Sequence, residues 1–385
     1  MRVAHIITRM IVGGAQENTL FNCLDLMRDF GDEVVLVTGP ATGPEGKLLD
    51  QGRAGGLQVH ECSRLRRAIH PWHDYQAYHQ IRTFLSEWKP DVVHTHSAKG
   101  GMLGRVAGWS LGVPAVIHTV HGAPFHPYQN AVARRFFIAC ERWAAKRCHH
   151  MICVADAMTD LMVQANVAPR EKFTTIYSGM DVEPLTQAHQ HRETMRKELG
   201  FRPEDIVFGK IARLFHLKGH EYVIEAARLL ADDQPNAKFL WVGDGILREA
   251  LERQIERAGL KDRFVFTGLV PPESIPKYLS AMDALIHTSL REGLARALPQ
   301  ALIAGKPVIS YDVDGAREVV IDGVTGYLLR PQAVESLAES IRRLALDPAL
   351  RERMGKTGRE RFTETFRHQT MTKQIRQIYQ RFAEP

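Results

Sequence analysis

The sequence predicts an α/β protein built from two doubly wound, Rossmann-like domains that face a central cleft. Short apolar runs alternate with amphipathic stretches along the whole chain, which is typical of β-α units on mainly parallel sheets. One polar stretch, 182–205, interrupts this alternation and is the expected linker. The 385 residues also suffice for two to three domains of about 150 residues each. We expect domains over 1–185 and 206–364, followed by a C-terminal helix over 365–385 that packs back toward the first domain.

Strands are expected where short runs of apolar and β-branched residues occur between turn residues. In the first half these runs are 3–7, 33–37, 91–95, 115–119 and 151–154. In the second half they are 206–211, 239–242, 263–267, 284–287, 307–310 and 327–329. Helices fill the gaps, for example 15–28, where Leu20, Leu24 and Met27 recur at helical spacing. Ligands of doubly wound sheets bind at the carboxyl ends of strands, so we expect the functional residues in the loops that follow strands.

The composition is that of an ordinary globular protein, with 44% hydrophobic and 24% charged residues. It excludes disorder, collagen and coiled coil as descriptions of the whole chain. The five cysteines form an odd set without CxxC spacing, so neither a disulfide framework nor a cysteine zinc site is expected. We find no signal peptide and no apolar stretch of about 18 residues, and we therefore expect a cytoplasmic protein that reaches a membrane only from its surface.

The net charge is +6, and the positive charge is unevenly distributed, with a clear excess between positions 101 and 150. This segment contains Arg105, Arg134, Arg135, Arg142, Lys146 and Arg147, against the single acid Glu141. It predicts contact with phosphates or an anionic lipid surface, and an ordinary solvated helix face is the alternative. We recognise no aromatic platform for stacking bases in this segment, so we expect no nucleic-acid partner.

Three loops that follow predicted strands carry residues suited to a diphosphate or a sugar. Gly13 and Gly14 open the first helix, where backbone amides form an anion site, although the G-x-G-x-x-G fingerprint is absent and an ordinary tight turn remains an alternative. Arg213 and Lys218 could hold a diphosphate from the other domain, and a pair of surface charges is the alternative.

The third loop contains Glu292 followed by Gly293, Leu294, Ala295 and Arg296. We expect the residues from Gly293 to Arg296 to present helix N-terminal amides to an anion. A carboxylate beside such amides suits a neutral polyol, so Glu292 is a candidate acceptor of sugar hydroxyls, with a helix-capping acid as the alternative.

Histidines gather at the ends of the first-domain strands. His94 and His96 form an H-x-H on a strand, which places both rings on one face and suggests a metallohydrolase. His121, before Gly122, could instead lie in the cleft and contact a reacting sugar. His118 and His126 are more simply explained as packing or hydrogen-bonding residues.

With these loops in place, the chain resembles the retaining, nucleotide-sugar-dependent glycosyltransferases of family 4, which have the two-domain GT-B fold. The resemblance covers nearly the whole length and is most specific over 291–329. The other segments that carry it are 13–15, 94–108, 116–126, 176–181, 211–219 and 241–245. The segment 291–329 is similar to the subgroup that builds capsule, exopolysaccharide and lipid-linked oligosaccharides in bacteria.

The resemblance implies an acceptor-side first domain and a nucleotide-sugar donor domain after it. It implies that Gly13 and Gly14 line the site near the diphosphate, that His121 contacts the donor sugar near its reacting carbon, and that Arg213 and Lys218 hold the diphosphate. Glu292 would bind donor-sugar hydroxyls, and the amides after Gly293 would meet the distal phosphate. The acceptor implied is a glycan or a polyprenyl-lipid-linked sugar, and the donor is expected to be a UDP-sugar.

The chain departs from the family at Gln300, where members usually have a second Glu that binds the nucleotide ribose. Cations already present at the diphosphate make a metal unnecessary, so we expect neither a metal nor a cofactor. Because no carboxylate nucleophile is evident, we expect front-face attack by the acceptor hydroxyl.

Three other classes of protein remain open from the sequence. A GT-B epimerase or phosphorylase would share the fold but would give different products. A non-catalytic sugar-nucleotide-binding protein is favoured by Gln300 alone, and a metallohydrolase by His94 and His96.

Overall fold

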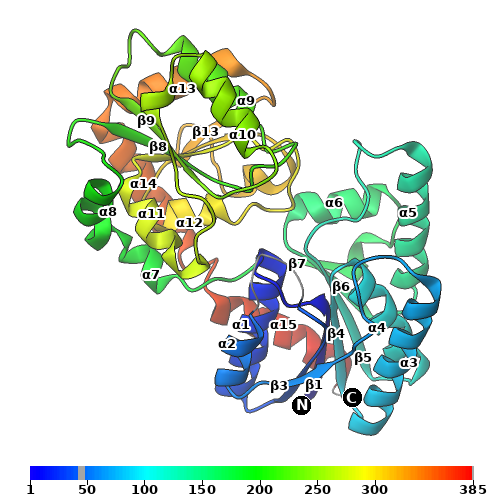
Figure 1. The fold of residues 1–385 in the computed structure, drawn as a ribbon. Helices are drawn as coiled ribbons and strands as arrows, with labels where there is room; N and C mark the ends of the chain where they lie inside the picture. The colour runs from blue at the N-terminus through cyan, green and yellow to red at the C-terminus, as the bar shows by residue number, and fades with distance from the viewer. Residues whose placement is uncertain (42–47, 384–385) are drawn as a thin grey trace. The chain divides into compact units, whose positions relative to one another are not determined.

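The computed structural model describes residues 1–41 and 48–383 and divides the chain into two compact units (Figure 1). Unit 1 comprises Met1–Met180 together with Thr365–Pro385, and unit 2 comprises Asp181–Glu364. Each unit has one parallel sheet with helices packed on it. The α/β class with two Rossmann-like units is therefore confirmed.

Unit 1 contains a seven-stranded sheet in the order β3-β2-β1-β4-β5-β6-β7. The strands are β1 (Arg2–Arg9), β2 (Glu33–Gly39), β3 (Gln58–Glu61), β4 (Val92–His96), β5 (Ala115–Val120), β6 (His150–Cys153) and β7 (Phe173–Thr175). The helices are α1 (Gly14–Phe30), α2 (Leu49–Ala54), α3 (Pro71–Trp88), α4 (Ala98–Ser110), α5 (Ala131–Ala145), α6 (Asp156–Gln164) and α15 (His368–Ala383). The inner strands are buried almost throughout, which agrees with their continuous apolar runs.

The two outermost strands, β3 and β7, are absent from the sequence expectation. They are short, with the sequences QVHE and FTT, and part of each is exposed to solvent. Each contains a single strongly apolar residue, so neither has the short apolar run that identifies the other strands, including the edge strands of unit 2, in the sequence.

Helix α15, at the C-terminal end of the chain, packs on α1 and β5. Met371, Ile375 and Tyr379 enter the core that β1 and α1 share. The buried carboxylate of Asp25 on α1 accepts hydrogen bonds from His368 Nδ1 at 2.6 Å and from the Thr372 hydroxyl at 2.9 Å. Side chains on 368–383 therefore complete the core of unit 1, while residues 384–385 of the expected segment lie outside the described part of the chain.

Unit 2 contains a six-stranded sheet in the order β10-β9-β8-β11-β12-β13. The strands are β8 (Ile206–Ile211), β9 (Ala237–Val242), β10 (Phe264–Phe266), β11 (Ala284–His287), β12 (Val308–Tyr311) and β13 (Gly326–Leu329). The helices are α7 (Glu183–Thr186), α8 (Arg192–Glu198), α9 (His220–Leu229), α10 (Arg248–Arg257), α11 (Ile275–Ala281), α12 (Ala297–Ile303), α13 (Val334–Leu346) and α14 (Pro348–Phe362). Helix α9 packs on α10 and α13, and α12 packs on α14.

The expected linker over 182–205 is wrong, because most of this polar segment folds as part of unit 2. It forms α7, a 3-10 turn and α8, and α8 packs on α11. Arg192 and Arg196 form ion pairs of 2.6 and 3.2 Å with Asp283, at the start of β11. Burial by itself raises the pKa of Asp283, but the two guanidinium groups and a backbone hydrogen bond lower it below the usual value. Ion pairs with Asp283, which is distant in sequence, thus hold α8 in unit 2. This helix therefore lacks the apolar periodicity by which other helices are recognised in the sequence.

In both units the strand order reverses next to the first strand of the sheet. The sheet of unit 1 extends outward from β1 to β3 and then continues on the other side with β4, and β8 and β11 have the same relation in unit 2. Loops that follow the two strands at such a switch point diverge and leave room for a ligand. The loops after β1 and β4, and those after β8 and β11, are therefore the expected ligand-binding loops.

Among the helices of the described residues, none is both long enough and apolar enough to cross a membrane.

Candidate active site

The switch point of unit 2 brings Lys218 and Glu292 together. Lys218 lies in the loop between β8 and α9, and Glu292 lies between β11 and α12. The Lys218 ammonium forms an ion pair with Glu292 Oε1, and both side chains are partly accessible, at 27% and 20% exposed. Two residues proposed from separate motifs thus form one charged pair that still faces solvent.

Polar groups hold both the carboxylate and the backbone of Glu292. His287 Nε2 lies 3.5 Å from Glu292 Oε1, and the Asp314 carboxylate accepts a 2.6 Å hydrogen bond from the Glu292 amide. Burial alone raises the pKa of Glu292, but His287 and Lys218 outweigh burial and hold it well below its usual range. Glu292 is therefore ionised at neutral pH and suited to accept hydrogen bonds from hydroxyl groups.

A second lysine, Lys210 on β8, forms hydrogen bonds to both of these loops. Its buried ammonium donates to the Lys218 carbonyl oxygen at 2.9 Å and to the Thr288 hydroxyl at 2.7 Å. Burial, with a smaller contribution from Lys218, lowers the pKa of Lys210 to about 7. Gly219 allows the close approach, since its φ is +64° and a Cβ there would lie 2.0 Å from the Thr288 carbonyl oxygen.

Arg213 lies two positions after the end of β8, at the carboxyl end of the sheet, and it is exposed. Its carbonyl oxygen lies 3.0 Å from Nε2 of the buried His220, which fixes the backbone of this loop. Arg213 and Lys218 thus occupy one loop whose backbone is anchored at both ends.

The expected helix N-terminus at Gly293 is wrong, since α12 begins only at Ala297. Gly293, Leu294 and Ala295 lie in the preceding loop, and Arg296 is the N-cap residue. Pro299 gives the physical reason: proline has no N–H and is tolerated in the first turn of a helix, so a helix that began at Gly293 would place it in the interior.

Gln300 lies on α12, eight positions after Glu292, and is partly buried. Its backbone amide and carbonyl take part in the helix, which leaves the side-chain amide as the group that can contact a ligand.

In unit 1, Gly13 is the N-cap residue and Gly14 the first residue of the 17-residue helix α1, after β1. His121 directly follows β5 and is partly buried. These three residues therefore lie at carboxyl ends of strands, as the sequence predicts.

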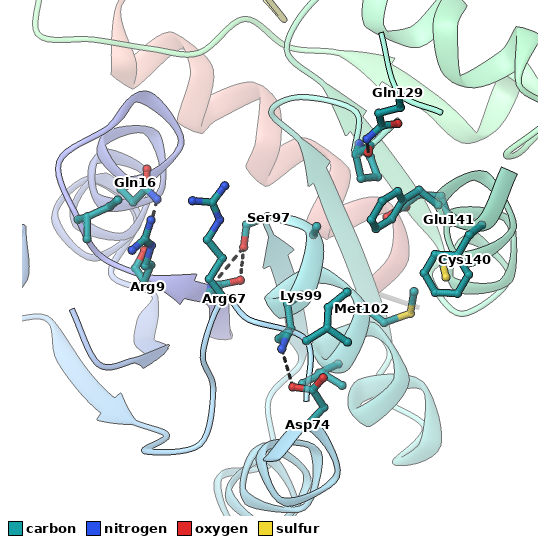
Figure 2. A pocket seen from close by; sticks show the side chains of 18 residues that line it. Arg9, Gln16, Arg67, Asp74, Ser97, Lys99, Met102, Gln129, Cys140 and Glu141 are labelled. Atoms are coloured by element: carbon teal, nitrogen blue, oxygen red, sulfur yellow. Dashed lines mark hydrogen bonds and ion pairs between the residues drawn. The ribbon is translucent and has the colours of Figure 1, made fainter. Parts of the chain in front are cut away.

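A pocket of about 560 Å³ opens at the switch point of unit 1 (Figure 2). One part of its wall is basic, with Arg9, Arg67 and Lys99, and Lys99 forms a 2.5 Å ion pair with Asp74. The rest is largely apolar and includes Ile69, Met102, Leu103, Phe136 and Phe137. Because Ile69 and Phe136 are 69% and 56% exposed, the pocket offers both cations and accessible apolar surface.

A second pocket of about 280 Å³ includes His121 in its wall. It shares Ser97, Ala98, Pro124 and Glu141 with the larger pocket, so the two adjoin. A ligand in the larger pocket would therefore lie next to His121.

The H-x-H pair is placed as expected, with both rings on one face of β4 and 4.2 Å between ring centroids. The rings are fully buried beside His5 of β1, and one nitrogen atom from each of His5, His94 and His96 lies within 4.8 Å of the others. Burial lowers the pKa of His5 to about 3 and lowers those of His94 and His96 well below the usual value. All three rings are thus neutral at pH 7, a state compatible with hydrogen bonding or with metal ligation.

The basic segment of 101–150 needs one correction. Arg105 is fully buried and forms an ion pair with the buried Glu141 at 3.0 Å, so neither residue belongs to a surface patch. Arg134, Arg135, Arg142 and Lys146 are exposed on or next to α5, and Arg142 donates to the Ala165 carbonyl oxygen at 2.7 Å.

Several residues of these sites are missing from the sequence prediction. Lys210 could have been found, because a lysine inside an apolar strand requires a polar partner. Asp314 could also have been found, since it follows β12 as other site residues follow their strands. Arg9 at the end of β1 and Lys99 after β4 carry the same sign, whereas Arg67 is brought to them only by the fold.

Both units match glycosyltransferase domains. The family described as "Glycosyl transferases group 1" matches residues 191–361, and the family described as "Glycosyl transferase 4-like domain" matches residues 14–179. The chain is 30% identical to 2-deoxystreptamine glucosyltransferase of Streptomyces kanamyceticus, over 72% of this chain and 74% of that protein.

Other relatives match over nearly the full length. The chain is 27% identical to UDP-Gal:alpha-D-GlcNAc-diphosphoundecaprenol alpha-1,3-galactosyltransferase of Escherichia coli, over 98% of this chain and 96% of that protein. Among solved structures, HepE of Anabaena in complex with UDP and glucose has a TM-score of 0.83 at 21% identity, over 98% of this chain and 99% of that chain. WaaG, a glycosyltransferase of lipopolysaccharide biosynthesis, has a TM-score of 0.74 at 17% identity, over the whole of both chains.

These similarities span the loops that carry Lys218 and Glu292 as well as those that carry His121, which a metallohydrolase built on His94 and His96 would not explain. The chain belongs to the family 4 type of glycosyltransferases with the two-domain GT-B fold.

Proposed function

We propose that this glycosyltransferase moves a sugar from a UDP-sugar to a hydroxyl of a glycan or a polyprenyl-diphosphate-linked acceptor, in the synthesis of a bacterial surface polysaccharide. The observation that carries the donor half is the pairing of Lys218 with Glu292 at the switch point of unit 2. A cation for the diphosphate and an ionised carboxylate for sugar hydroxyls lie side by side there, with Arg213 on the same loop. The E. coli relative, named for a UDP-galactose donor, and the UDP-bound HepE structure support UDP as the nucleotide.

The acceptor half of the proposal rests on the larger pocket of unit 1. Its basic residues suit the phosphates of a lipid-linked acceptor, and its apolar residues suit the adjoining sugar faces or the first part of a lipid. His121 of the adjoining pocket would contact the donor sugar, with Gly13 and Gly14 near the diphosphate. The diphosphoundecaprenol in the name of the E. coli relative supports this class of acceptor.

For the chemistry, we propose transfer with retention of configuration. Negative charge grows on the departing diphosphate as the glycosidic bond breaks, and Arg213 and Lys218 would stabilise it. Glu141, a carboxylate in the wall of the His121 pocket, already forms an ion pair with Arg105, which argues against its acting as a nucleophile. Front-face attack by the acceptor hydroxyl is consistent with that arrangement.

The experiment that tests this proposal is product analysis with purified protein, several UDP-sugars and a short-chain polyprenyl-diphosphate sugar as acceptor. We expect a new glycosidic bond that forms only when donor and acceptor are both present. Conversion of the donor without acceptor would support the epimerase instead. Calorimetric binding of the donor without turnover of any acceptor would support the sugar-nucleotide-binding protein.

Transfer is expected to persist in excess EDTA, because Arg213 and Lys218 supply the charge that a metal ion would otherwise provide. The measurement is the initial rate with and without chelator, and with magnesium added back. Loss of activity in EDTA that magnesium restores would contradict this assignment.

Gln300→Glu is expected to tighten UDP binding by about 1 kcal/mol, the typical gap between charged and neutral hydrogen bonds. A carboxylate can accept from both ribose hydroxyls, whereas an amide offers one acceptor oxygen. The measurement is the Kd of each protein for UDP and for 2'-deoxy-UDP. If neither protein distinguishes the two nucleotides, Gln300 does not contact the ribose.

We expect the protein to bind anionic vesicles in a salt-dependent way through α5. Val132, Phe136 and Trp143 are exposed apolar residues of this helix, with Arg134, Arg135 and Lys146 exposed on or next to it. Each basic residue near an anionic surface contributes about 1 kcal/mol.

Co-sedimentation with phosphatidylglycerol and phosphatidylcholine vesicles tests this, with the Arg134→Gln, Arg135→Gln double variant as the probe. Lys261→Gln of unit 2, which removes one exposed surface cation paired with Glu256, is the control. Equal binding to the two kinds of vesicle would remove the electrostatic explanation.

A further inference from the structure

Three histidine rings form a hydrogen-bonded chain through unit 1 that ends at His121. His5 Nδ1 lies 3.0 Å from His96 Nε2, and His96 Nδ1 lies 3.1 Å from His121 Nε2. His5 and His96 are fully buried, whereas His121 is partly accessible and lies in the wall of a pocket. The chain therefore connects the sheet interior to a residue of the candidate active site.

The register of the sheet builds this chain. His5 of β1 pairs with His94 of β4, and His96 of β4 pairs with Thr119 of β5. Side chains two positions apart in a strand lie on the same face, so His96 lies beyond His94 and His121 lies beyond Thr119 on that face. The ring centroids of His5 and His96 lie 5.3 Å apart with 15° between the ring planes, and those of His96 and His121 lie 5.4 Å apart with 29° between them, as expected for rings joined edge to edge through their nitrogen atoms.

The proton positions in such a chain depend on one another. A neutral imidazole has one N–H donor and one bare nitrogen that accepts, so His96 donates to one neighbour and accepts from the other. His5 and His96 are neutral, since burial lowers the pKa of His5 to about 3 and that of His96 well below its usual value. Two directions are then possible: His96 either donates to His121 or accepts from it.

The buried histidine, His5, decides between these two directions of hydrogen bonding. His5 Nε2 is buried and has no hydrogen-bond partner among the described residues. A buried donor without an acceptor is the rarer of the two unsatisfied states in proteins, so we assign His5 Nε2 as a bare nitrogen. His5 Nδ1 then carries the proton and donates to His96 Nε2, and His96 Nδ1 donates to His121 Nε2.

We infer that His96, supported by His5, is a positioning residue that holds His121 in the tautomer with its proton on Nδ1. The inference rests on the proposed contact between His121 and the donor sugar. In this tautomer Nε2 of His121 accepts a hydrogen bond from His96, and Nδ1 carries the proton. The hydrogen bond from His96 to Nε2 also fixes the orientation of the His121 ring beside the donor sugar.

The neighbouring His94 provides a matched control. It lies on the same strand and face and is equally buried, but its nitrogen atoms contact the Tyr379 hydroxyl at 2.5 Å and the Thr119 hydroxyl at 2.7 Å. A substitution there disturbs the same part of the core without removing a hydrogen bond to His121.

The test compares His96→Leu, His96→Asn and His94→Leu in the full-length protein. His96→Leu removes the donor, and we expect kcat for transfer to fall by about 10- to 100-fold with a smaller change in the KM of the donor. In His96→Asn the side-chain amide nitrogen can replace Nδ1 as a donor, so part of the loss in kcat is expected to be recovered. His94→Leu is expected to keep kcat within about threefold at a temperature below the unfolding transition of all three variants.

The second readout does not depend on activity. In protein labelled with 15N-histidine, the ring signals of His121, assigned by their loss in His121→Gln, are expected to show protonated Nδ1 and bare Nε2. In His96→Leu the two tautomers are expected to be mixed. If His121→Gln retains full activity while the wild-type signals are as expected, the proposed contact with the sugar is wrong. The inference about the hydrogen-bonded histidines is then still correct.

Three results would overturn the inference. The first is protonated Nε2 in the wild-type protein, which reverses the direction of the chain. The second is an equal loss of kcat in His96→Leu and His94→Leu, which shows only a disturbed core. The third is about one equivalent of zinc in the purified protein, lost together with His5, His94 and His96, because these rings would then be metal ligands.

Discussion

Lys218→Ala is expected to lower kcat/KM for the donor by about 30- to 1,000-fold, corresponding to roughly 2 to 4 kcal/mol of transition-state stabilisation. Lys218 supplies a charge whose position is already fixed by its ion pair with Glu292, so little reorganisation is needed when charge grows on the diphosphate. The measurement is steady-state kinetics with the donor varied at saturating acceptor. Lys218→Arg is expected to recover part of the loss, because the guanidinium group keeps the positive charge but spreads it over a larger, planar group.

A surface pair in the same unit gives the control for this variant. Lys261 forms a 3.1 Å ion pair with Glu256 and is 76% exposed. Lys261→Ala removes an equal charge, and we expect no measurable change in kcat/KM. If Lys218→Ala lowers kcat/KM by less than about threefold, Lys218 does not stabilise the leaving group.

Glu141→Ala is expected to destabilise unit 1 by about 3 to 5 kcal/mol, the usual cost of leaving a buried charge without its partner. Arg105 of α4 is fully buried and donates to both carboxylate oxygens of Glu141, at 3.0 and 3.3 Å. It also donates to the Gly101 carbonyl oxygen, so removal of Glu141 leaves the guanidinium only partly satisfied. The double variant Arg105→Met, Glu141→Leu is expected to regain most of the lost stability, because no buried charge remains.

The measurement is urea unfolding followed by tryptophan fluorescence. Of the five tryptophans, Trp241 lies in unit 2 and the other four lie in unit 1, so a Trp241→Phe background reports on unit 1 alone. Glu256→Ala, which breaks the exposed pair with Lys261, is expected to cost less than about 1 kcal/mol. An equal cost in the two variants would show that burial does not strengthen the pair of Arg105 and Glu141.

The sequence predicted all the described strands except the two edge strands of unit 1, and the structure confirms them to within a few residues. It also placed Arg213, Lys218, Glu292 and His121 in loops that follow strands, where they are found. Both results depend on local signals. A strand buried on both faces requires a continuous apolar run, and a parallel sheet gathers the loops at the carboxyl ends of its strands.

Where the partner of a residue is distant along the chain, the sequence alone gave a wrong prediction or no prediction of the contact. Arg105 was assigned to a basic surface because its neighbours in sequence are basic, yet Glu141 on another helix holds it in the interior. The segment 182–205 was assigned to a linker because it is polar, yet Arg192 and Arg196 pair with Asp283 some 90 residues further on. The free energy of burying a charge is decided by its partner, and no local pattern identifies that partner.

The sequence by itself thus determined the fold class, most of the strands and the set of loops that carry the chemistry, because these follow from apolar runs and strand direction. Only the tertiary structure decided which charges are neutralised and which rings share protons. The register of β1, β4 and β5 aligns His5, His96 and His121, and the switch point of unit 2 brings Lys218 to Glu292. Such contacts join residues dozens of positions apart, so they exist only once the sheets have formed.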